Sequence, residues 1–307
     1  MKYYNYQSKY NNSTIKLKWI YSFLNYNLFL GNLCHIFLFQ IKEWLKRQYK
    51  FLFFQYIIRS MKSNKENYYG NLSSLVYNQS KPPGTSIDGD IEFYTNELIK
   101  RDGLVLEAGV GNGRMAIPLL RKGISIFGLD NSKEMLAIYE ENLKKYNMES
   151  QLILGDLINF ETNLKFETII MPNGSFCLLN RNDIYSVLSN FKRHLTENGK
   201  IYLDLIFPTS FKPGNIHEYD FILDNNDTVK IKNKSISIDW LLQKTYTELE
   251  YLNNSEIEIQ PFSLWWYGVE EFKSILEKLE FKNIKTIKNY NNIKNLNLKT
   301  LTFVFEK

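Results

Sequence analysis

A glycine-rich segment follows an apolar run in the first half of the chain. Gly109, Gly111 and Gly113 come directly after residues 104–106 and directly before residues 114–122, which have helical spacing. Glycines in this place allow a tight turn without side chains, so a ligand can approach the backbone at the amide end of the following helix. Turns of this composition also occur without a ligand, so the glycines alone leave both interpretations open.

A carboxylate stands at the end of the next predicted strand. Asp130 closes the apolar run 124–129, where it can accept hydrogen bonds from both hydroxyls of a ribose. A helix cap within residues 130–132 is a second interpretation, compatible with the first. A dinucleotide fingerprint needs glycine at the sixth position counted from Gly109, and this chain has Arg114 there. The spacing therefore disfavours a pyrophosphate, and with it an NAD-dependent oxidoreductase.

These residues resemble motif I and its partner motifs in the class I S-adenosylmethionine-dependent methyltransferases. Glu107 precedes the Gly-x-Gly-x-Gly pattern by two residues, as in that family. Further segments similar to family motifs are residues 128–132 with 135–136, 155–157, 166–170 and 195–200. The resemblance extends over about residues 68–307. It implies methyl transfer, S-adenosyl-L-methionine as cofactor, and a doubly wound, Rossmann-like α/β fold with a seven-stranded, mostly parallel sheet.

The resemblance also implies roles for individual positions. Glu107 and the first two glycines would hold the methionyl part, and Asp130 would bind the ribose diol. Asn131 and Met135 would border the adenine, and Asp156 would accept from its amino group. The complete set of candidate cofactor-binding residues is Tyr77, Glu107, Gly109, Gly111, Asn112, Gly113, Arg114, Asp130, Asn131, Met135, Asp156, Leu157 and Asn173.

Three of these residues have roles that the sequence leaves open. Arg114 could pair with the methionyl carboxylate or point to solvent from its helix face. Tyr77 is the preferred residue for capping the cofactor, although aromatic side chains there could equally pack the insertion onto the sheet. Asn173 follows the fourth predicted strand, where the acceptor sits in the family. The other aromatic candidates are Tyr68, Tyr69, Trp265, Trp266 and Tyr267.

Methyl transfer from a sulfonium depends on alignment, so proximity and exclusion of water can supply most of the catalysis. We therefore assign no catalytic base. Residues 171–173, Met-Pro-Asn, do not match the Asn/Asp-Pro-Pro-aromatic signature of methylases that act on base amines. A small-molecule acceptor with a nitrogen or oxygen nucleophile, such as a metabolite or a sugar-like compound, is expected under the insertion. A cofactor-binding but catalytically idle partner subunit is the alternative.

The net charge of +5 has its origin in the first sixty residues. Residues 1–60 contain nine basic side chains and one acidic side chain, which leaves 29 basic and 32 acidic side chains in residues 61–307. This balance argues against binding to nucleic acid, which depends on basic surfaces. Cys34 and Cys177 form no CxxC motif and no cluster with histidine, so neither disulfides nor a metal site is expected. A cytoplasmic location is expected.

Residues 1–60 form a basic, hydrophobic leader. Residues 19–41 are uncharged and long enough for a membrane span, but six polar side chains among them weaken that interpretation. We expect the leader to lie outside the functional protein, with translation beginning at Met61. The alternatives are an amphipathic partner helix and a membrane anchor within residues 19–58.

Alternating apolar periods predict the architecture of the remainder. Strands are expected at residues 104–106, 124–129, 151–154, 166–171 and 199–207, and helices at 87–101, 114–122, 132–146, 183–195 and 269–280. This order predicts right-handed crossovers and a mainly parallel sheet. Residues 68–85 have the composition of a linker. The expected domains are the leader at 1–60, an N-terminal cap segment at 61–101, and a methyltransferase domain at 102–307 with an antiparallel β insertion at about 212–264.

Overall fold

The computed structural model describes residues 41–46, 66–254, 256–291 and 297–307. The chain divides into two compact units, residues 1–63 and 64–307. In the first unit, residues 41–46 are helical, and Lys46 pairs with Glu43 at 2.7 Å. The rest of the predicted leader lies outside the described residues. Within the described part of the chain, no helix has the length and apolar character needed to cross a membrane.

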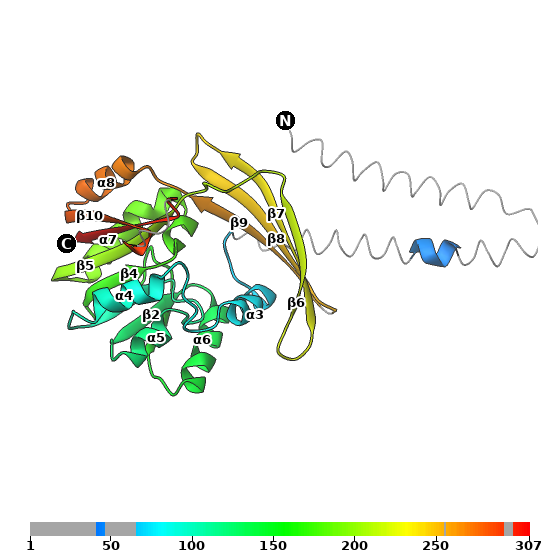
Figure 1. Ribbon diagram of the computed structural model, residues 1–307, viewed down its shortest axis with the longest axis horizontal. Coiled ribbons are helices and arrows are strands. Elements are labelled where there is room, and N and C mark those ends of the chain that lie inside the picture. Colours follow the sequence, from blue (N-terminus) through cyan, green and yellow to red (C-terminus); the bar gives the residue numbers. More distant parts are fainter. Residues whose placement is uncertain (1–40, 47–65, 255, 292–296) are drawn as a thin grey trace, which may run out of the picture. The chain divides into compact units, whose positions relative to one another are not determined.

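Seven strands of the second unit form one sheet, sheet A, in the order β10-β11-β5-β4-β1-β2-β3. Strands β1 to β5 pair in parallel with one another, whereas β11 is antiparallel to both β5 and β10. The predicted doubly wound, mostly parallel sheet is therefore confirmed (Figure 1). The strands are β1 (Val105–Ala108), β2 (Ile126–Asp130), β3 (Gln151–Leu154), β4 (Phe166–Met171), β5 (Leu195–Ile206), β10 (Lys282–Lys288) and β11 (Thr300–Glu306).

Helices cover both faces of sheet A. Because successive residues of a strand point to opposite faces, Leu106 lies in one apolar cluster and Val105 in another. The first cluster includes side chains of α7 and α8, and the second includes side chains of α4, α5 and α6. These helices are α4 (Asp90–Leu98), α5 (Ala116–Arg121), α6 (Lys133–Lys145), α7 (Ile184–His194) and α8 (Val269–Lys278).

A second sheet, sheet B, follows β5 in the chain. Its four antiparallel strands are consecutive, in the order β6-β7-β8-β9, which confirms the predicted antiparallel insertion. Figure 1 shows them in yellow-green to orange beside the helix α3 (Asn71–Ser80), which contacts β9. The strands are β6 (Ile216–Ile222), β7 (Thr228–Asp239), β8 (Lys244–Leu252) and β9 (Ile257–Trp265).

The prediction of a linker over residues 68–85 is wrong, because α3 lies within this range. The segment is rich in Asn and Ser, which are poor helix formers, so its local sequence does not indicate a helix. Tertiary contacts supply the stability instead. Leu72 and Val76 are buried against sheet B, and the Glu258 carboxylate accepts from the backbone N–H groups of Leu72 at 2.8 Å and Ser73 at 3.3 Å. A side chain of β9 thus caps a helix that precedes it by 186 residues.

Candidate cofactor and acceptor site

A pocket lies at the carboxyl edge of sheet A. The ends of β1 to β4 meet there, because parallel strands place their carboxyl ends at one edge of a sheet. Eight of the predicted cofactor-binding residues line this pocket: Tyr77, Gly109, Gly111, Asp130, Asn131, Met135, Asp156 and Leu157. Ten further residues complete its wall: Glu66, Asn67, Tyr68, Tyr69, Leu129, Gly155, Met171, Ser175, Leu178 and Leu179.

Backbone hydrogen bonds join the glycine turn, residues 109–113, to β2. The N–H groups of Gly109 and Val110 donate to the Leu129 carbonyl at 2.7 and 3.0 Å. Gly109 and Gly111 have positive φ angles of 78° and 57°, which glycine adopts readily. A Cβ atom at Gly111 would meet no atom of the described chain within 4 Å, so the backbone there faces open space. At Gly113 the same atom would lie 2.3 Å from the Tyr139 ring, so that glycine serves packing.

Glu107 is the one charged residue of β1 and lies two residues before Gly109. Its carboxylate is buried. Its side chain is 3% exposed, and its Oε2 has no hydrogen-bond partner among the described residues. Burial raises the Glu107 pKa to about 8, although the nearby Arg114 charge acts in the opposite direction. Unsatisfied buried carboxylate oxygens are rare in folded proteins. This oxygen is suited to a cationic group such as the ammonium of a methionyl moiety.

Arg114 is buried, and the predicted alternative that it points to solvent is wrong. Its guanidinium contacts the Asp90 carboxylate at 2.6 Å and the Thr85 carbonyl at 2.8 Å. Asp90 begins α4 and is itself fully buried, so the ion pair fixes α4 to the helix that follows the turn. The sequence gives no sign of this pair, because its members are 24 residues apart.

Asn112 also lies behind the pocket wall. Its amide nitrogen donates to the Asn78 side chain at 2.9 Å and to the Lys81 carbonyl at 3.0 Å. Asn78 accepts a second bond from Asn142 at 2.9 Å. These contacts join the turn to α3 and α6. Five of the predicted cofactor-binding residues do not line the pocket: Glu107, Asn112, Gly113, Arg114 and Asn173.

Two aspartates, Asp130 and Asp156, line the pocket at the ends of β2 and β3. Asp130 accepts from the backbone N–H of Gly111 and from that of Ser132, both at 2.9 Å. Ser132 caps α6 by accepting from Met135 N–H at 3.1 Å, so the helix cap expected within residues 130–132 is present. Asp156 accepts from the N–H of Ile158 at 3.0 Å in the turn after β3. The carboxylates are thus held by backbone groups at the rim.

Asn173 lies in the turn after β4 but not in the pocket wall. Its φ is 55°, and its N–H donates to the buried Asp204 carboxylate at 2.7 Å. Its neighbours Met171 and Ser175 do line the pocket. Asn173 therefore fixes the backbone conformation of the turn, and Met171 and Ser175 on either side of it line the pocket.

Residues 66–69 line the pocket from the N-terminal side; the sequence indicates Tyr68 and Tyr69 as aromatic candidates but gives no role to Glu66 and Asn67. The Asn67 amide donates to the carbonyls of Leu178 at 2.7 Å and Ser263 at 3.0 Å, which joins the segment after β4 to β9. Tyr68 Oη donates to Glu134 at 2.6 Å. The clustering of tyrosines was the one sequence signal for this segment. Tyr69 contacts Tyr77 edge to face, with ring centroids 5.6 Å apart.

Comparisons with known proteins agree with this geometry. Residues 105–199 match a family model described as a methyltransferase domain. An uncharacterized methyltransferase of Bacillus mycoides is 33% identical over 109 residues, which are 35% of this chain and 50% of that protein. The chain therefore spans about half the length of the curated relatives it matches.

Solved structures share the fold. An S-adenosylmethionine-dependent methyltransferase from Clostridium acetobutylicum superposes with a TM-score of 0.62 at 16% identity, covering 75% of this chain and 96% of that one. A sugar N-methyltransferase from Streptoalloteichus gives a TM-score of 0.62 at 16% identity, covering 80% and 96%. Residues 105–199 are thus similar to a methyltransferase domain. The predicted resemblance to S-adenosylmethionine-dependent methyltransferases is confirmed.

A second cavity of about 380 Å³ adjoins the pocket at the carboxyl edge of sheet A, which we call the cofactor pocket. Tyr69 and Tyr77 line both, so the two tyrosine rings form their boundary. We call this cavity the acceptor cleft. It lies between α3 and the inner face of sheet B, and it is lined by Tyr69, Ser73, Val76, Tyr77, Ser80, Lys81, Phe211, Tyr219, Asn233, Ser235, Thr245, Thr247, Leu249, Tyr251, Gln260, Phe262 and Leu264.

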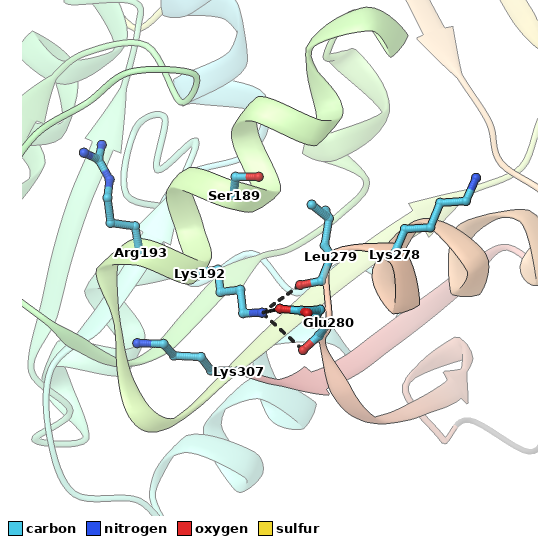
Figure 2. A pocket seen from close by; sticks show the side chains of 7 residues that line it. All are labelled: Ser189, Lys192, Arg193, Lys278, Leu279, Glu280 and Lys307. Atoms are coloured by element: carbon cyan, nitrogen blue, oxygen red, sulfur yellow. Dashed lines mark hydrogen bonds and ion pairs between the residues drawn. The ribbon is translucent and has the colours of Figure 1, made fainter.

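A different hollow, of about 430 Å³, lies between α7 and the end of α8 (Figure 2). Lysine and arginine side chains gather there, but their contacts are structural. Lys192 Nζ donates to the carbonyls of Leu279 at 2.7 Å and Glu280 at 3.2 Å, which satisfies carbonyl groups at the C-terminus of α8. Arg193 pairs with Glu161 at 2.8 Å. The methyltransferase-domain motifs contribute no residue to this hollow.

Proposed function

We propose that the protein is an S-adenosylmethionine-dependent methyltransferase that methylates a nitrogen or oxygen atom of a small, sugar-like acceptor. The observation that carries this proposal is the unpaired Glu107 Oε2, buried directly before the glycine turn. A buried carboxylate without a partner tends to take up a proton, in line with its pKa of about 8, and a bound cation would stabilise its charged form. The sugar N-methyltransferase of similar fold supports the acceptor class.

The pocket residues fit this cofactor. Gly109 and Gly111 would let the methionyl part approach the backbone. Glu107 does not line the pocket itself, but it lies two residues before Gly109, where its unpaired oxygen would bind the methionyl ammonium. Asp130 would bind the ribose hydroxyls, and Asp156 the adenine amino group. Backbone N–H groups already orient both aspartates, so little conformational entropy is lost when they bind a ligand.

When bound, S-adenosylmethionine would supply an electrophilic methyl group for a nitrogen or oxygen atom of the acceptor, with S-adenosylhomocysteine as the leaving group and the acceptor proton lost to solvent. The chain provides alignment and exclusion of water. Tyr69 and Tyr77 stand between the two cavities, and residues 66–69 cover the cofactor side.

The acceptor cleft matches a neutral, hydroxylated molecule. Among the described residues that line it, none is Asp, Glu or His, and Lys81 is the one cation. Hydroxyl and amide groups from Ser235, Thr247 and Asn233 can exchange hydrogen bonds with hydroxyls, while the aromatic rings can cover a sugar face. We assign catalysis to positioning, because the described residues that line this cleft include no Asp, Glu or His.

Isothermal titration calorimetry with S-adenosylmethionine, its demethylated product and NAD tests the cofactor assignment. We expect both methionine derivatives to bind and NAD not to bind. Asp130→Ala should weaken S-adenosylmethionine about tenfold or more, since hydrogen bonds to a charged group contribute about 1.5–3 kcal/mol. The matched control is Asp102→Ala, which removes an exposed aspartate outside the pocket and should leave affinity unchanged.

Two results would contradict the cofactor assignment: absence of binding by either methionine derivative, and equal affinity of wild type and Asp130→Ala. Turnover is measured separately, with a methyl-labelled donor and a panel of amino sugars and simple glycosides. Cofactor binding without label transfer to any acceptor in the panel would favour the catalytically idle subunit over the enzyme.

A further inference from the structure

Lys81 is the one cationic side chain among the described residues that line the acceptor cleft. Its Nζ lies over the Tyr77 ring, 5.0 Å from the ring centroid, and this ring forms part of the boundary with the cofactor pocket. Lys81 directly follows α3, where its carbonyl accepts a hydrogen bond from the Asn112 amide at 3.0 Å. The chain therefore places a positive charge at the end of the cleft that adjoins the cofactor pocket.

The described groups around Lys81 do not neutralise its charge. Burial lowers the Lys81 pKa, the nearby Arg114 charge lowers it further, and no carboxylate of the described residues raises it. Two carboxylates act electrostatically on the adjoining Tyr77 side chain. Asp90 is paired with Arg114 at 2.6 Å, and we assign Glu107 to the methionyl ammonium. This region of the cleft therefore disfavours a second positive charge.

Glu258 lies on the face of sheet B toward α3, but it does not line the cleft. Its carboxylate accepts from the backbone N–H groups of Gly70 at 3.3 Å, Leu72 at 2.8 Å and Ser73 at 3.3 Å. These groups form the N-terminus of α3, whereas Lys81 follows its C-terminus, and a helix of ten residues is about 15 Å long. The Glu258 charge is therefore engaged at the opposite end of α3 from Lys81.

The other titratable groups of the cleft add no negative charge. Burial raises the pKa of the hydroxyl groups of Tyr69, Tyr77 and Tyr251, so these side chains stay neutral. A further cavity of about 290 Å³ shares four lining residues with the cleft. It adds Lys212 and His217, and its lining within the described chain includes no Asp or Glu. The space open to an acceptor thus offers positive and neutral groups.

The carboxylates of the neighbouring cofactor pocket already have partners. Glu66 pairs with Lys244 at 2.9 Å. Asp130 and Asp156 accept from backbone N–H groups, and we assign them to the ribose and the adenine. An ammonium group at the tyrosine boundary would therefore meet the Lys81 charge and find no carboxylate to balance it, at a cost that an uncharged amine avoids.

We propose that Lys81 excludes ammonium ions from the acceptor cleft, so that an amine acceptor is bound in its uncharged form. This inference rests on the proposed function and narrows its substrate class to amines that bind with the nitrogen lone pair free. The proton passes to solvent before binding, and the methylated nitrogen then carries the positive charge that the sulfonium loses. A cleft with a carboxylate at this position would bind the ammonium instead and would need a base to deprotonate it. Lys81 is thus a specificity-determining residue that selects the reactive protonation state.

The test measures proton release on binding of methyl β-D-glucosaminide and of methyl β-D-glucopyranoside, which has a hydroxyl in place of the amino group. Calorimetry is done in two buffers of different ionisation enthalpy, one pH unit below the pKa of the free amine as measured by NMR titration. The protein is saturated with S-adenosylhomocysteine, which has no sulfonium charge, so that the charges of the chain alone act on the amine. We expect the amino compound to release about 0.8 proton per site more than the hydroxyl compound.

Three variants assign this release to Lys81. Lys81→Met should lower it by half or more, because loss of a neighbouring charge raises the pKa of the bound amine by about one unit or more. Lys81→Arg keeps the charge and should retain the wild-type release. The matched control is Lys122→Met, which removes an exposed lysine outside the cleft and should also retain it.

Each result bears on the proposal. Release near 0.8 proton that Lys81→Met halves and the other two variants retain supports the exclusion of ammonium ions, with about 0.8 as the value expected from linkage. Release close to zero in wild type, equal release in wild type and Lys81→Met, an equal loss in Lys122→Met, or absence of binding by the amino compound overturns it. If S-adenosylhomocysteine itself fails to bind wild type, the proposed function fails first, and this outcome is separate because it is measured before either glycoside is added.

Discussion

Two buried carboxylates of sheet A, Glu107 on β1 and Asp204 on β5, differ in how their charge is satisfied. Burial raises the pKa of both. Asp204 accepts from the hydroxyls of Thr302 and Tyr290 at 2.6 Å, from Tyr94 Oη at 3.0 Å, and from Asn173 N–H at 2.7 Å.

Oε2 of Glu107, by contrast, has no partner in the part of the chain that the structure describes. A carboxylate with four donors organises its surroundings, so we assign Asp204 to stability. One that is buried with an unpaired oxygen reduces stability unless a ligand supplies the partner. We therefore assign Glu107 to ligand binding. The distinction comes from the donors, because both groups are buried to a similar degree.

The largest effect is expected at Asp204. Asp204→Ala leaves buried hydroxyl and amide donors unsatisfied, each at about 1–3 kcal/mol, so the free energy of unfolding should fall by about 4 kcal/mol or more. Urea denaturation measures it. If that variant does not fold, Thr302→Val removes one donor and should lower the free energy by about 1 kcal/mol. A loss under about 0.5 kcal/mol in both variants would contradict the assignment to stability.

Glu107→Gln should separate binding from stability. The amide has the same shape but no charge for the methionyl ammonium, so affinity for S-adenosylmethionine should fall about a hundredfold, or about 2.7 kcal/mol. The free energy of unfolding without ligand should stay the same or rise at pH 8, because the buried ionisable group is gone. Calorimetry and urea denaturation on the same sample test both statements. Destabilisation comparable to that of Asp204→Ala would erase the distinction between the two carboxylates.

The pH dependence of stability should also report on Glu107. Its pKa rises from 4.5 to about 8 in the folded protein, so between these values the native state keeps a proton that the unfolded chain has lost. The native state binds more protons in that window, and stability therefore falls as pH rises through it. Relative to Glu107→Gln, ligand-free wild type should lose about 2 kcal/mol between pH 6 and pH 8. A constant difference between the two proteins across this range would show that the Glu107 pKa is not raised.

Among the predicted site residues, those at strand ends are brought together in one pocket. Asp130 and Asp156 each follow an apolar run directly, and the geometry of a parallel sheet then brings them together without further information. Local periodicity is sufficient there because each strand and its carboxyl end are contiguous in the chain.

The contacts that the sequence could not reveal are long-range. Asn67 binds the backbone of Ser263, 196 residues away, and Glu258 caps α3 across sheet B. The partner of Arg114 is likewise visible only when α4 is placed. Composition made residues 68–85 resemble a linker, because tertiary packing rather than intrinsic propensity stabilises their helix.

The smallest expected effect concerns Tyr77, at the boundary between the cofactor pocket and the acceptor cleft. If its ring acts by covering the cofactor, Tyr77→Ala should weaken S-adenosylmethionine about three- to tenfold, whereas Tyr77→Phe should change affinity less than about threefold. The control is Tyr185→Ala, which removes an exposed tyrosine of α7. If Tyr77→Phe and Tyr77→Ala lose the same affinity for S-adenosylmethionine, the hydroxyl group and not the ring is responsible. Tyr77 would then bind the cofactor through a polar atom, as we propose for Glu107, and not by covering it with the ring.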